Sequence, residues 1–223
     1  MKFVEYPDRD MMMLSIANTI AGQLGDFLRR QPTVSLCVPG GTTPGPVFDV
    51  LSGVDLDWSR VAIFLNDERW VAETSPRSNT RLLRERLLVG RAAAAQLVPL
   101  YGGGDTPEDQ METLAEGLKP HLPISVLMLG MGNDYHTASL FPGADRLAEA
   151  MAPNAPILLP MRADAAGEPR ITLSLPVLQG AMATHVLITG PEKRAAFERA
   201  QTLDPMQAPI RAVLANATVH WAE

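Results

Sequence analysis

The chain has 223 residues, of which 46% are hydrophobic and 20% are charged, and its formal net charge is −6. This composition indicates a globular protein with one large core and argues against a disordered chain. Because the chain has no dense run of Lys and Arg, nucleic acid is not an expected partner. No apolar run approaches the ~20 residues that cross a bilayer, so no membrane association is expected.

The cysteine content and the first residues point to the cytoplasm. The one cysteine, Cys37, cannot form an internal disulfide, which fits a reducing compartment. It lies within an apolar run, and we interpret it as a packing residue rather than a nucleophile. The N-terminus lacks a basic segment followed by an apolar one, so no secretory signal is predicted.

Helical and strand periodicities alternate through the N-terminal half. Apolar residues at spacings of three and four predict a helix over residues 9–30. Strands are predicted over Thr33–Val38 and Val61–Leu65. Pro44 stands where a helix would begin, and helical spacing returns over Ser78–Leu88.

The same alternation continues to the C-terminus. A short strand is predicted over Leu97–Tyr101, and Thr106 is predicted to cap the helix that follows, because acidic residues occupy its first turn. Another helix is predicted from about Glu192 to Gln201. The remaining predicted strands are Ile124–Leu129, Ile157–Leu159, Ile171–Leu175, Val186–Thr189 and Thr218–Trp221.

Continuous apolar strands separated by helices indicate a largely parallel sheet that is covered on both faces. We therefore predict the α/β class, a three-layer αβα fold with a largely parallel, doubly wound sheet. Because no repeat or linker interrupts the chain, residues 1–223 are expected to form a single domain. Ligands of such sheets bind beyond the carboxyl ends of the strands, which makes the loops there the candidate sites.

The loop after the strand ending at Val38 is a candidate phosphate-binding segment. Gly40 and Gly41 let the backbone approach an anion, and the following helix N-terminus offers free N–H groups. Thr42 and Thr43 add hydroxyl donors. A tight strand-to-helix turn also uses two glycines, and this alternative stays open.

Polar side chains directly follow the next buried strand: Asn66, Asp67, Glu68 and Arg69. An unpaired buried charge is costly, so these residues either face a cleft or form a salt-bridge cluster on the surface. Asn79, further along, belongs to the same site or to the cap of the next helix.

The strongest candidate is the loop after Leu129, which is bounded by glycines. Asp134 and His136 lie two residues apart there and suit the roles of an orienting acid and a general base. A histidine on a loop can equally be structural, and the pair can ligate a metal, but no third ligand stands nearby in sequence. The other histidines have no such setting and are interpreted as structural: His121, His185 and His220.

Two basic residues stand near strand and helix ends. Arg170 opens an apolar strand, and Lys193 falls in the first turn of a helix, where a cation opposes the helix dipole. This placement suggests that the ammonium group of Lys193 has a ligand, although a solvated lysine is the alternative.

Together these segments resemble the 6-phosphogluconolactonase family, within the glucosamine-6-phosphate isomerase/lactonase superfamily. The resemblance covers nearly the whole chain in order, through Pro39–Pro44, Asp67–Arg69 with Ser78–Asn79, Leu129–Gly143, Arg170–Leu173, and Thr189–Gly190 with Lys193. The continuation from Thr137 to Gly143 looks like lactonases. Deaminases typically carry Asn-Glu-Pro at that point, and Asp-Glu-Tyr where this chain has Asp67-Glu68-Arg69.

The resemblance implies hydrolysis of 6-phosphogluconolactone to 6-phosphogluconate, a pentose phosphate pathway reaction that needs no metal or cofactor. His136 would take a proton from the attacking water, and Asp134 would orient it. Arg69 would position the substrate or stabilise the oxyanion, and Asp67 is a further catalytic candidate. The implied substrate- and phosphate-binding residues are Gly40, Gly41, Thr42, Thr43, Asn79, Arg170 and Lys193.

One position departs from the family, which usually has Gly between the Asp and the His where this chain has Tyr135. A bulky residue with positive φ is strained. The sequence therefore predicts that the loop has shifted or that Tyr135 adopts an ordinary backbone conformation.

Two alternatives remain from the sequence. A sugar-phosphate isomerase or deaminase on the same fold would use a carboxylate such as Asp67 for proton transfer, whereas a non-catalytic sensor would keep the phosphate site with its base disabled by Tyr135. The expected partner is a small phosphorylated sugar lactone, and the chain is expected to be a monomer or a homodimer.

Overall fold

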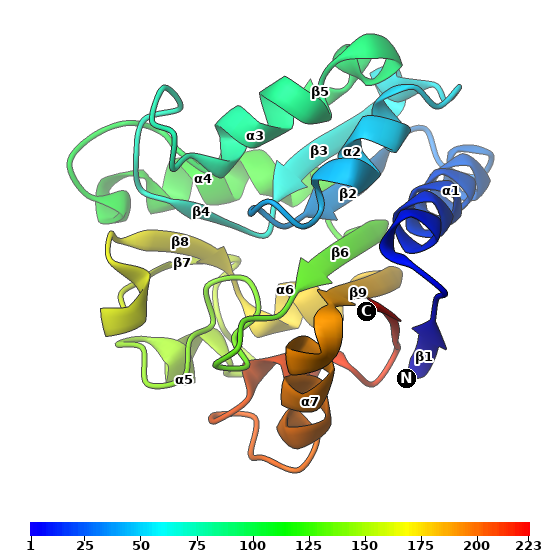
Figure 1. Ribbon diagram of the computed structural model, residues 1–223. Helices are drawn as coiled ribbons and strands as arrows, with labels where there is room; N and C mark the ends of the chain where they lie inside the picture. The colour runs from blue at the N-terminus through cyan, green and yellow to red at the C-terminus, as the bar shows by residue number, and fades with distance from the viewer.

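The computed structural model describes residues 1–223, apart from the side chain of Ala165. Its main feature is a seven-stranded sheet in the order β1-β10-β9-β6-β2-β3-β5, with parallel pairing throughout (Figure 1). The strands are β1 (Lys2–Glu5), β2 (Val34–Val38), β3 (Val61–Leu65), β5 (Gln96–Leu97), β6 (Val126–Gly130), β9 (Ala183–Thr189) and β10 (Ala217–Ala222). The predicted fold class is confirmed.

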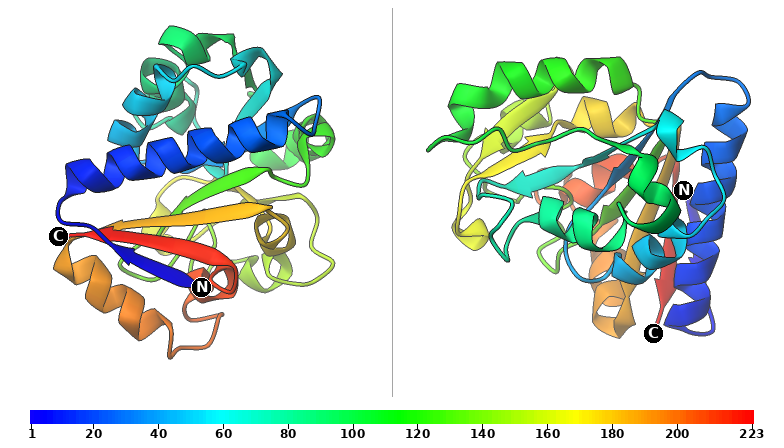
Figure 2. Two further views of the ribbon diagram at one scale, coloured as in Figure 1. Left: turned by 90° about the vertical axis from the view of Figure 1, so that its right-hand side faces the viewer. Right: turned by 90° about the horizontal axis from the view of Figure 1, so that it is seen from above.

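Helices flank this sheet, and α1 lies across one of its faces (Figure 2). Asp8 caps α1, because its Oδ1 accepts the Met11 N–H at 2.7 Å. The helices are α1 (Arg9–Leu28), α2 (Gly45–Ser52), α3 (Asn79–Arg86), α4 (Met111–Leu118), α5 (Leu147–Ala150), α6 (Leu175–Gln179) and α7 (Gly190–Ala200). Short 3₁₀ turns are η1 (Trp58–Arg60), η2 (Gly90–Ala94), η3 (Pro107–Gln110), η4 (Lys119–His121), η5 (Asp164–Ala166) and η6 (Pro209–Val213). None of the described helices is long and apolar enough to cross a membrane.

The central strands are buried on both faces. Every residue of β2 and of β3 is buried, Cys37 among them, as predicted for a packing residue. Strands of this kind appear in the sequence as unbroken apolar runs, so the predicted ends of β2 and β3 differ from the observed ends by no more than one residue.

A second, three-stranded sheet was not foreseen. It has the order β4-β8-β7, with β4 at Asp67–Arg69, β7 at Leu158–Met161 and β8 at Arg170–Leu173, and its pairing is antiparallel. Only Asn66 separates β3 from β4, so the chain leaves the main sheet and enters the small one at this residue. The polar residues after β3 are thus themselves a strand.

Two local predictions were wrong. The side chain of Thr106 does not cap a helix; its hydroxyl donates to Asp109 Oδ2 at 3.2 Å, and the segment begins as η3 before α4. The strand expected at Leu97–Tyr101 ends at Leu97. Pro99 has no N–H to continue the ladder, so the pairing stops after the Val98 N–H reaches Ile63 O.

The sheet order fixes where a ligand can bind. From β2 the chain proceeds to β3 and β5 on one side, and from β6 it proceeds to β9 and β10 on the other. The connections therefore diverge between the neighbouring strands β2 and β6, and the loops leave a crevice at their carboxyl ends.

Two of the histidines interpreted as structural form a buried hydrogen-bonded chain beneath α1. His185 Nε2 lies 2.8 Å from Gln23 Oε1, so it is a donor, and His185 Nδ1 must then accept from His220 Nε2 at 3.0 Å. His220 Nδ1 in turn accepts from the Tyr6 hydroxyl at 2.8 Å. Each ring thus uses both nitrogens in its neutral form, and protonating either ring removes an acceptor.

Burial lowers the pKa of His185 to about 4, and burial together with the neighbouring His185 lowers that of His220 to about 3. Unfolded histidines bind protons below about pH 6.5, so the unfolded state gains protons first as the pH falls. We expect the free energy of unfolding to be highest above pH 7 and to fall by roughly 1 kcal/mol per histidine per pH unit between pH 6.5 and 5. Urea midpoints measured at half-unit steps test this, and midpoints that stay constant over the window would contradict it.

Candidate active site

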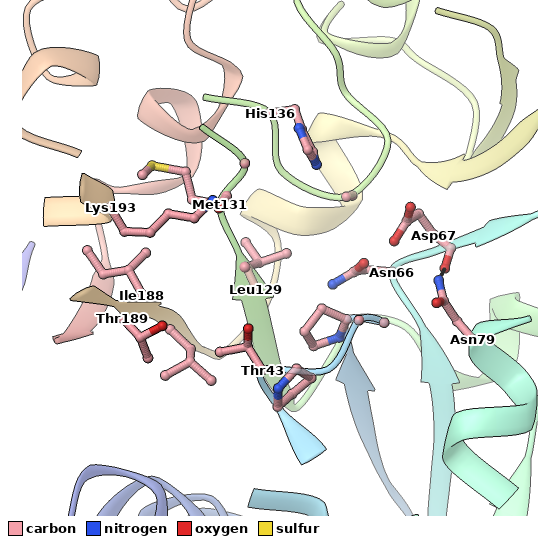
Figure 3. Close-up of a pocket in the computed structure, with 18 of the residues that line it drawn as sticks. Thr43, Asn66, Asp67, Asn79, Leu129, Met131, His136, Ile188, Thr189 and Lys193 are labelled. Carbon is pink, nitrogen blue, oxygen red and sulfur yellow. Dashed lines mark hydrogen bonds between the residues drawn. The ribbon is translucent and has the colours of Figure 1, made fainter. Parts of the chain in front are cut away.

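A pocket of about 240 Å³ opens at the carboxyl ends of β2, β3, β6 and β9. Most of the predicted site residues line it: Gly40, Gly41, Thr43, Asp67, Arg69, Asn79, His136, Arg170 and Lys193. Thr42 and Asp134 do not line it. Figure 3 shows His136 directed into the pocket, with Lys193 on one side and Asp67 and Asn79 on the other.

Asp134 and His136 form a hydrogen-bonded pair. Asp134 Oδ1 lies 2.5 Å from His136 Nδ1 and also accepts the His136 N–H at 3.3 Å. Burial alone would raise the pKa of Asp134, but the bond and charge of His136 outweigh it and lower that pKa. With Nδ1 engaged, Nε2 is the ring nitrogen that remains to act on a ligand.

Gly132 is required by this pair. A Cβ atom at Gly132 would lie 2.1 Å from His136 Nδ1 and 2.4 Å from Asp134 Oδ1. Both side chains therefore pack directly over the Gly132 backbone. Any side chain at this position would displace the acid–base pair.

Tyr135 does not adopt the ordinary backbone conformation that was one of the two expectations drawn from the sequence. Its φ is 69°, in the left-handed region, and the Asp134–His136 pair is nevertheless formed. A non-glycine residue in this conformation costs of order 1–3 kcal/mol and persists only where its surroundings hold it. The loop thus keeps the backbone that a glycine would adopt.

Two arginines lie directly opposite each other in the small sheet. Arg69 of β4 pairs in register with Arg170 of β8, an arrangement that like charges normally destabilise. Arg170 is 9% exposed, and burial, with the charge of Arg69 adding to it, lowers its pKa despite Asp67. Asp67 Oδ2 lies 3.6 Å from Arg170 Nη1.

These guanidinium groups keep unused donors. Arg170 donates to Ala166 O at 3.2 Å, and Arg69 donates to Arg77 O at 2.8 Å. Among the described residues, no hydrogen-bond acceptor meets the Nε of Arg69 or of Arg170. A buried cation with unused donors beside a pocket is suited to an anionic ligand.

Glu68 connects β4, which carries Arg69, to the first turn of α3. It is fully buried, and its Oε1 accepts the N–H groups of Arg69 and Asn79 at 2.8 and 2.9 Å. Its Oε2 accepts from the Thr80 N–H and hydroxyl and from the Ser78 hydroxyl, at 2.7 to 3.2 Å. Burial raises the pKa of Glu68, and these hydrogen bonds oppose the rise. The carboxylate therefore fixes the start of α3 next to the pocket.

The choice left open for Asn79 is resolved by geometry. Ser78 caps α3, because its hydroxyl accepts the Arg81 N–H at 3.3 Å. The side chain of Asn79 instead faces Gly40, where a Cβ atom would lie 2.0 Å from Asn79 Cγ. Asn79 lines the pocket, and Gly40 leaves it the room to do so.

The phosphate-loop candidate and Lys193 border the pocket from the side of the main sheet. Gly41 has φ 83°, and α2 begins after Pro44 without a side-chain cap. Lys193 lies in the first turn of α7, where its Nζ donates to Met131 O at 2.6 Å, and burial lowers its pKa. Two of its three donors remain available.

Two further polar residues belong to the surroundings of the pocket, and the sequence had pointed to only one of them, Asn66, as a residue that faces a cleft. Asn66 is fully buried, lines the pocket and donates from Nδ2 to Met128 O at 3.1 Å. Ser139 donates to Asp67 Oδ2 at 2.6 Å and so holds that carboxylate from the far side. Asn66 was signalled by its place directly after a buried strand, whereas no such signal marked Ser139, which lies within the loop after β6. In the described part of the chain, no cluster of three His, Cys, Asp or Glu residues is arranged to hold a metal ion.

Known proteins share both the sequence and the fold. The family model described as glucosamine-6-phosphate isomerases/6-phosphogluconolactonase matches residues 7–221. A 6-phosphogluconolactonase of Mesorhizobium japonicum is 41% identical, with 97% of this chain and 93% of the relative aligned, and one of Pseudomonas aeruginosa is 41% identical over 92% and 88%. The crystal structure of a 6-phosphogluconolactonase from Shewanella baltica superposes with a TM-score of 0.96 at 34% identity, covering 100% of this chain and 97% of that one.

The match to the family model spans nearly the whole chain, and the full-length relatives exceed 30% identity. The chain therefore belongs to the glucosamine-6-phosphate isomerase/6-phosphogluconolactonase family.

Proposed function

We propose that this chain hydrolyses 6-phosphogluconolactone to 6-phosphogluconate by general-base activation of water. The relatives named 6-phosphogluconolactonase, at up to 41% identity over nearly the whole chain, confirm the lactonase expected from the sequence. One observation carries the proposal: His136, hydrogen-bonded to Asp134 behind it, lines the same pocket as Arg69, Arg170 and Lys193. An acid–base pair and an anion site thus face the same ligand.

The chemistry assigned to the pair follows from its hydrogen bond. With Nδ1 held by Asp134, His136 Nε2 takes a proton from water as the water oxygen bonds to the lactone carbonyl carbon. Asp134 stabilises the imidazolium that results. The tetrahedral intermediate collapses by breaking the bond to the ring oxygen, and His136 returns the proton to that oxygen. Arg69 supplies positive charge beside the developing oxyanion.

The phosphate is assigned to the remaining donors of the pocket. Arg170 and Lys193 make charge-assisted hydrogen bonds to it, and backbone N–H groups of the loop over Gly41–Thr43 contribute at the uncapped start of α2. Gly40 and Asn79 line the pocket beside this loop and are assigned to substrate binding. Asp67, held by Ser139 and Arg170, is read as an orienting carboxylate for the substrate.

Two assays of the purified protein test the proposal. Lactone consumption is followed with freshly made 6-phosphogluconolactone, with the spontaneous hydrolysis of the δ-lactone subtracted, and ammonia release is followed with glucosamine 6-phosphate. We expect catalysed consumption of the lactone and no ammonia. Ammonia release would identify a deaminase instead, and tight binding of 6-phosphogluconate without turnover would identify a sensor.

A further inference from the structure

The loop that carries the acid–base pair is closed by its own backbone. The Gly132 N–H donates to His136 O at 2.9 Å, and the Tyr135 N–H donates back to Gly132 O at 3.0 Å. Because the side chains of Asp134 and His136 pack over Gly132, the backbone of this loop sets where both groups lie.

Tyr135 separates the two members of the pair and holds the left-handed conformation, with φ 69°. Its carbonyl accepts the Ile210 N–H of η6 at 3.1 Å, and its half-buried ring packs against the core. Its hydroxyl accepts from Arg199 Nε of α7 at 3.4 Å. The backbone contacts would survive with glycine at this position, but the contacts of the ring would not.

The same helix holds the loop at two points. Lys193, in the first turn of α7, binds Met131 O at 2.6 Å, and Arg199, in the last turn, meets the Tyr135 hydroxyl. In Figure 1 the loop after β6 runs beside α7. Since a helix is stiff over this length, the two contacts restrain the segment between them.

We propose that Tyr135 is a positioning residue, whose ring packs against the core, holds the acid–base loop in place and so keeps Asp134 and His136 aligned for proton transfer. This rests on the proposed role of His136 as the base. The ring carries most of the effect, because the hydroxyl contact is long and exposed. Tyr135 does not line the pocket and acts through His136.

The test compares Tyr135→Gly, which removes the ring and suits the backbone, with Tyr135→Phe, which keeps the ring. Misplacing a reacting group by about 1 Å lowers rates by up to ~10²-fold. We expect kcat of Tyr135→Gly to fall about tenfold, with KM and the affinity for 6-phosphogluconate within about twofold of the unmodified protein. Tyr135→Phe should restore most of kcat. Arg194→Ala, which removes a charge of α7 that pairs with Glu5 and Glu198, is the matched control and should leave kcat unchanged.

A second readout does not depend on turnover. The proton between His136 Nδ1 and Asp134 Oδ1, which are 2.5 Å apart, should give a low-field ¹H NMR signal in the unmodified protein. We expect this signal to weaken or exchange rapidly in Tyr135→Gly and to persist in Tyr135→Phe. If the unmodified protein hydrolysed no lactone, the proposed function would fail, and this signal would still decide the role of Tyr135.

Two results would overturn the inference. The first is a Tyr135→Gly variant with full kcat and an unchanged His136 signal. The second is a loss of kcat accompanied by an equal loss of affinity for 6-phosphogluconate and a lower unfolding midpoint, which would make Tyr135 a residue of general stability.

Discussion

Replacing His136 by alanine should reduce kcat by ~10²–10⁴-fold, the range that positioned general bases contribute. The reason is geometric: Nδ1 is held by Asp134, and the imidazole is directed into the pocket, which leaves Nε2 as the base. Binding of 6-phosphogluconate should change little, because the cations assigned to the phosphate come from β8 and α7. Steady-state rates and calorimetric titration with the product measure the two quantities.

His121→Ala is the matched control, since His121 belongs to η4 and does not line the pocket, and it should keep normal turnover. Near-normal turnover in His136→Ala would transfer the role of base to another group, with Asp67 as the next candidate.

Removing either assigned phosphate ligand should separate two substrates. We expect Arg170→Ala and Lys193→Ala to lower kcat/KM for the phosphorylated lactone. The loss of transition-state stabilisation should be about 2–5 kcal/mol, the usual effect of truncating one partner of a buried charge-assisted contact. With unphosphorylated gluconolactone the same variants should change kcat/KM only slightly. The unused donors of Arg170 beside the pocket motivate this expectation.

Arg162→Ala controls for the loss of a positive charge as such, because Arg162 is exposed and paired with Glu108. It should affect neither substrate. Equal losses on both substrates in Arg170→Ala would assign that arginine to the sugar or the oxyanion, and the phosphate to another part of the pocket.

The sequence indicated most strands of the main sheet and the loops that follow them, but not the edge strand β1. The strands β2, β3 and β6 are buried on both faces, so their apolar runs could be read directly, and the turns after them stood out as glycine-rich or polar. The Asp134–His136 pair could be predicted as a candidate because two residues so close on one loop are within reach of each other. The sugar-phosphate chemistry came from the resemblance carried by these loops.

Long-range pairing was decided only by the tertiary structure. The small antiparallel sheet sets Arg69 opposite Arg170. The register of this pairing joins two strands that lie far apart in the sequence, and the hydrophobic pattern of neither strand indicates its partner. The contact of Ser139 with Asp67 arises in the same way, between segments far apart in the chain.

The backbone of Tyr135 shows where a local rule fails and tertiary contacts decide the conformation. A local rule predicted either an ordinary conformation or a displaced loop, because positive φ is unfavourable for a bulky residue. The fold holds it at φ 69° through contacts with η6 and α7, which the residues around Tyr135 do not reveal. The sequence by itself therefore determined most strands of the main sheet, the loops at their ends and the proximity of Asp134 to His136, since these depend on neighbouring residues. The tertiary structure determined which distant cations and ring contacts complete the site, because these depend on how the elements pack.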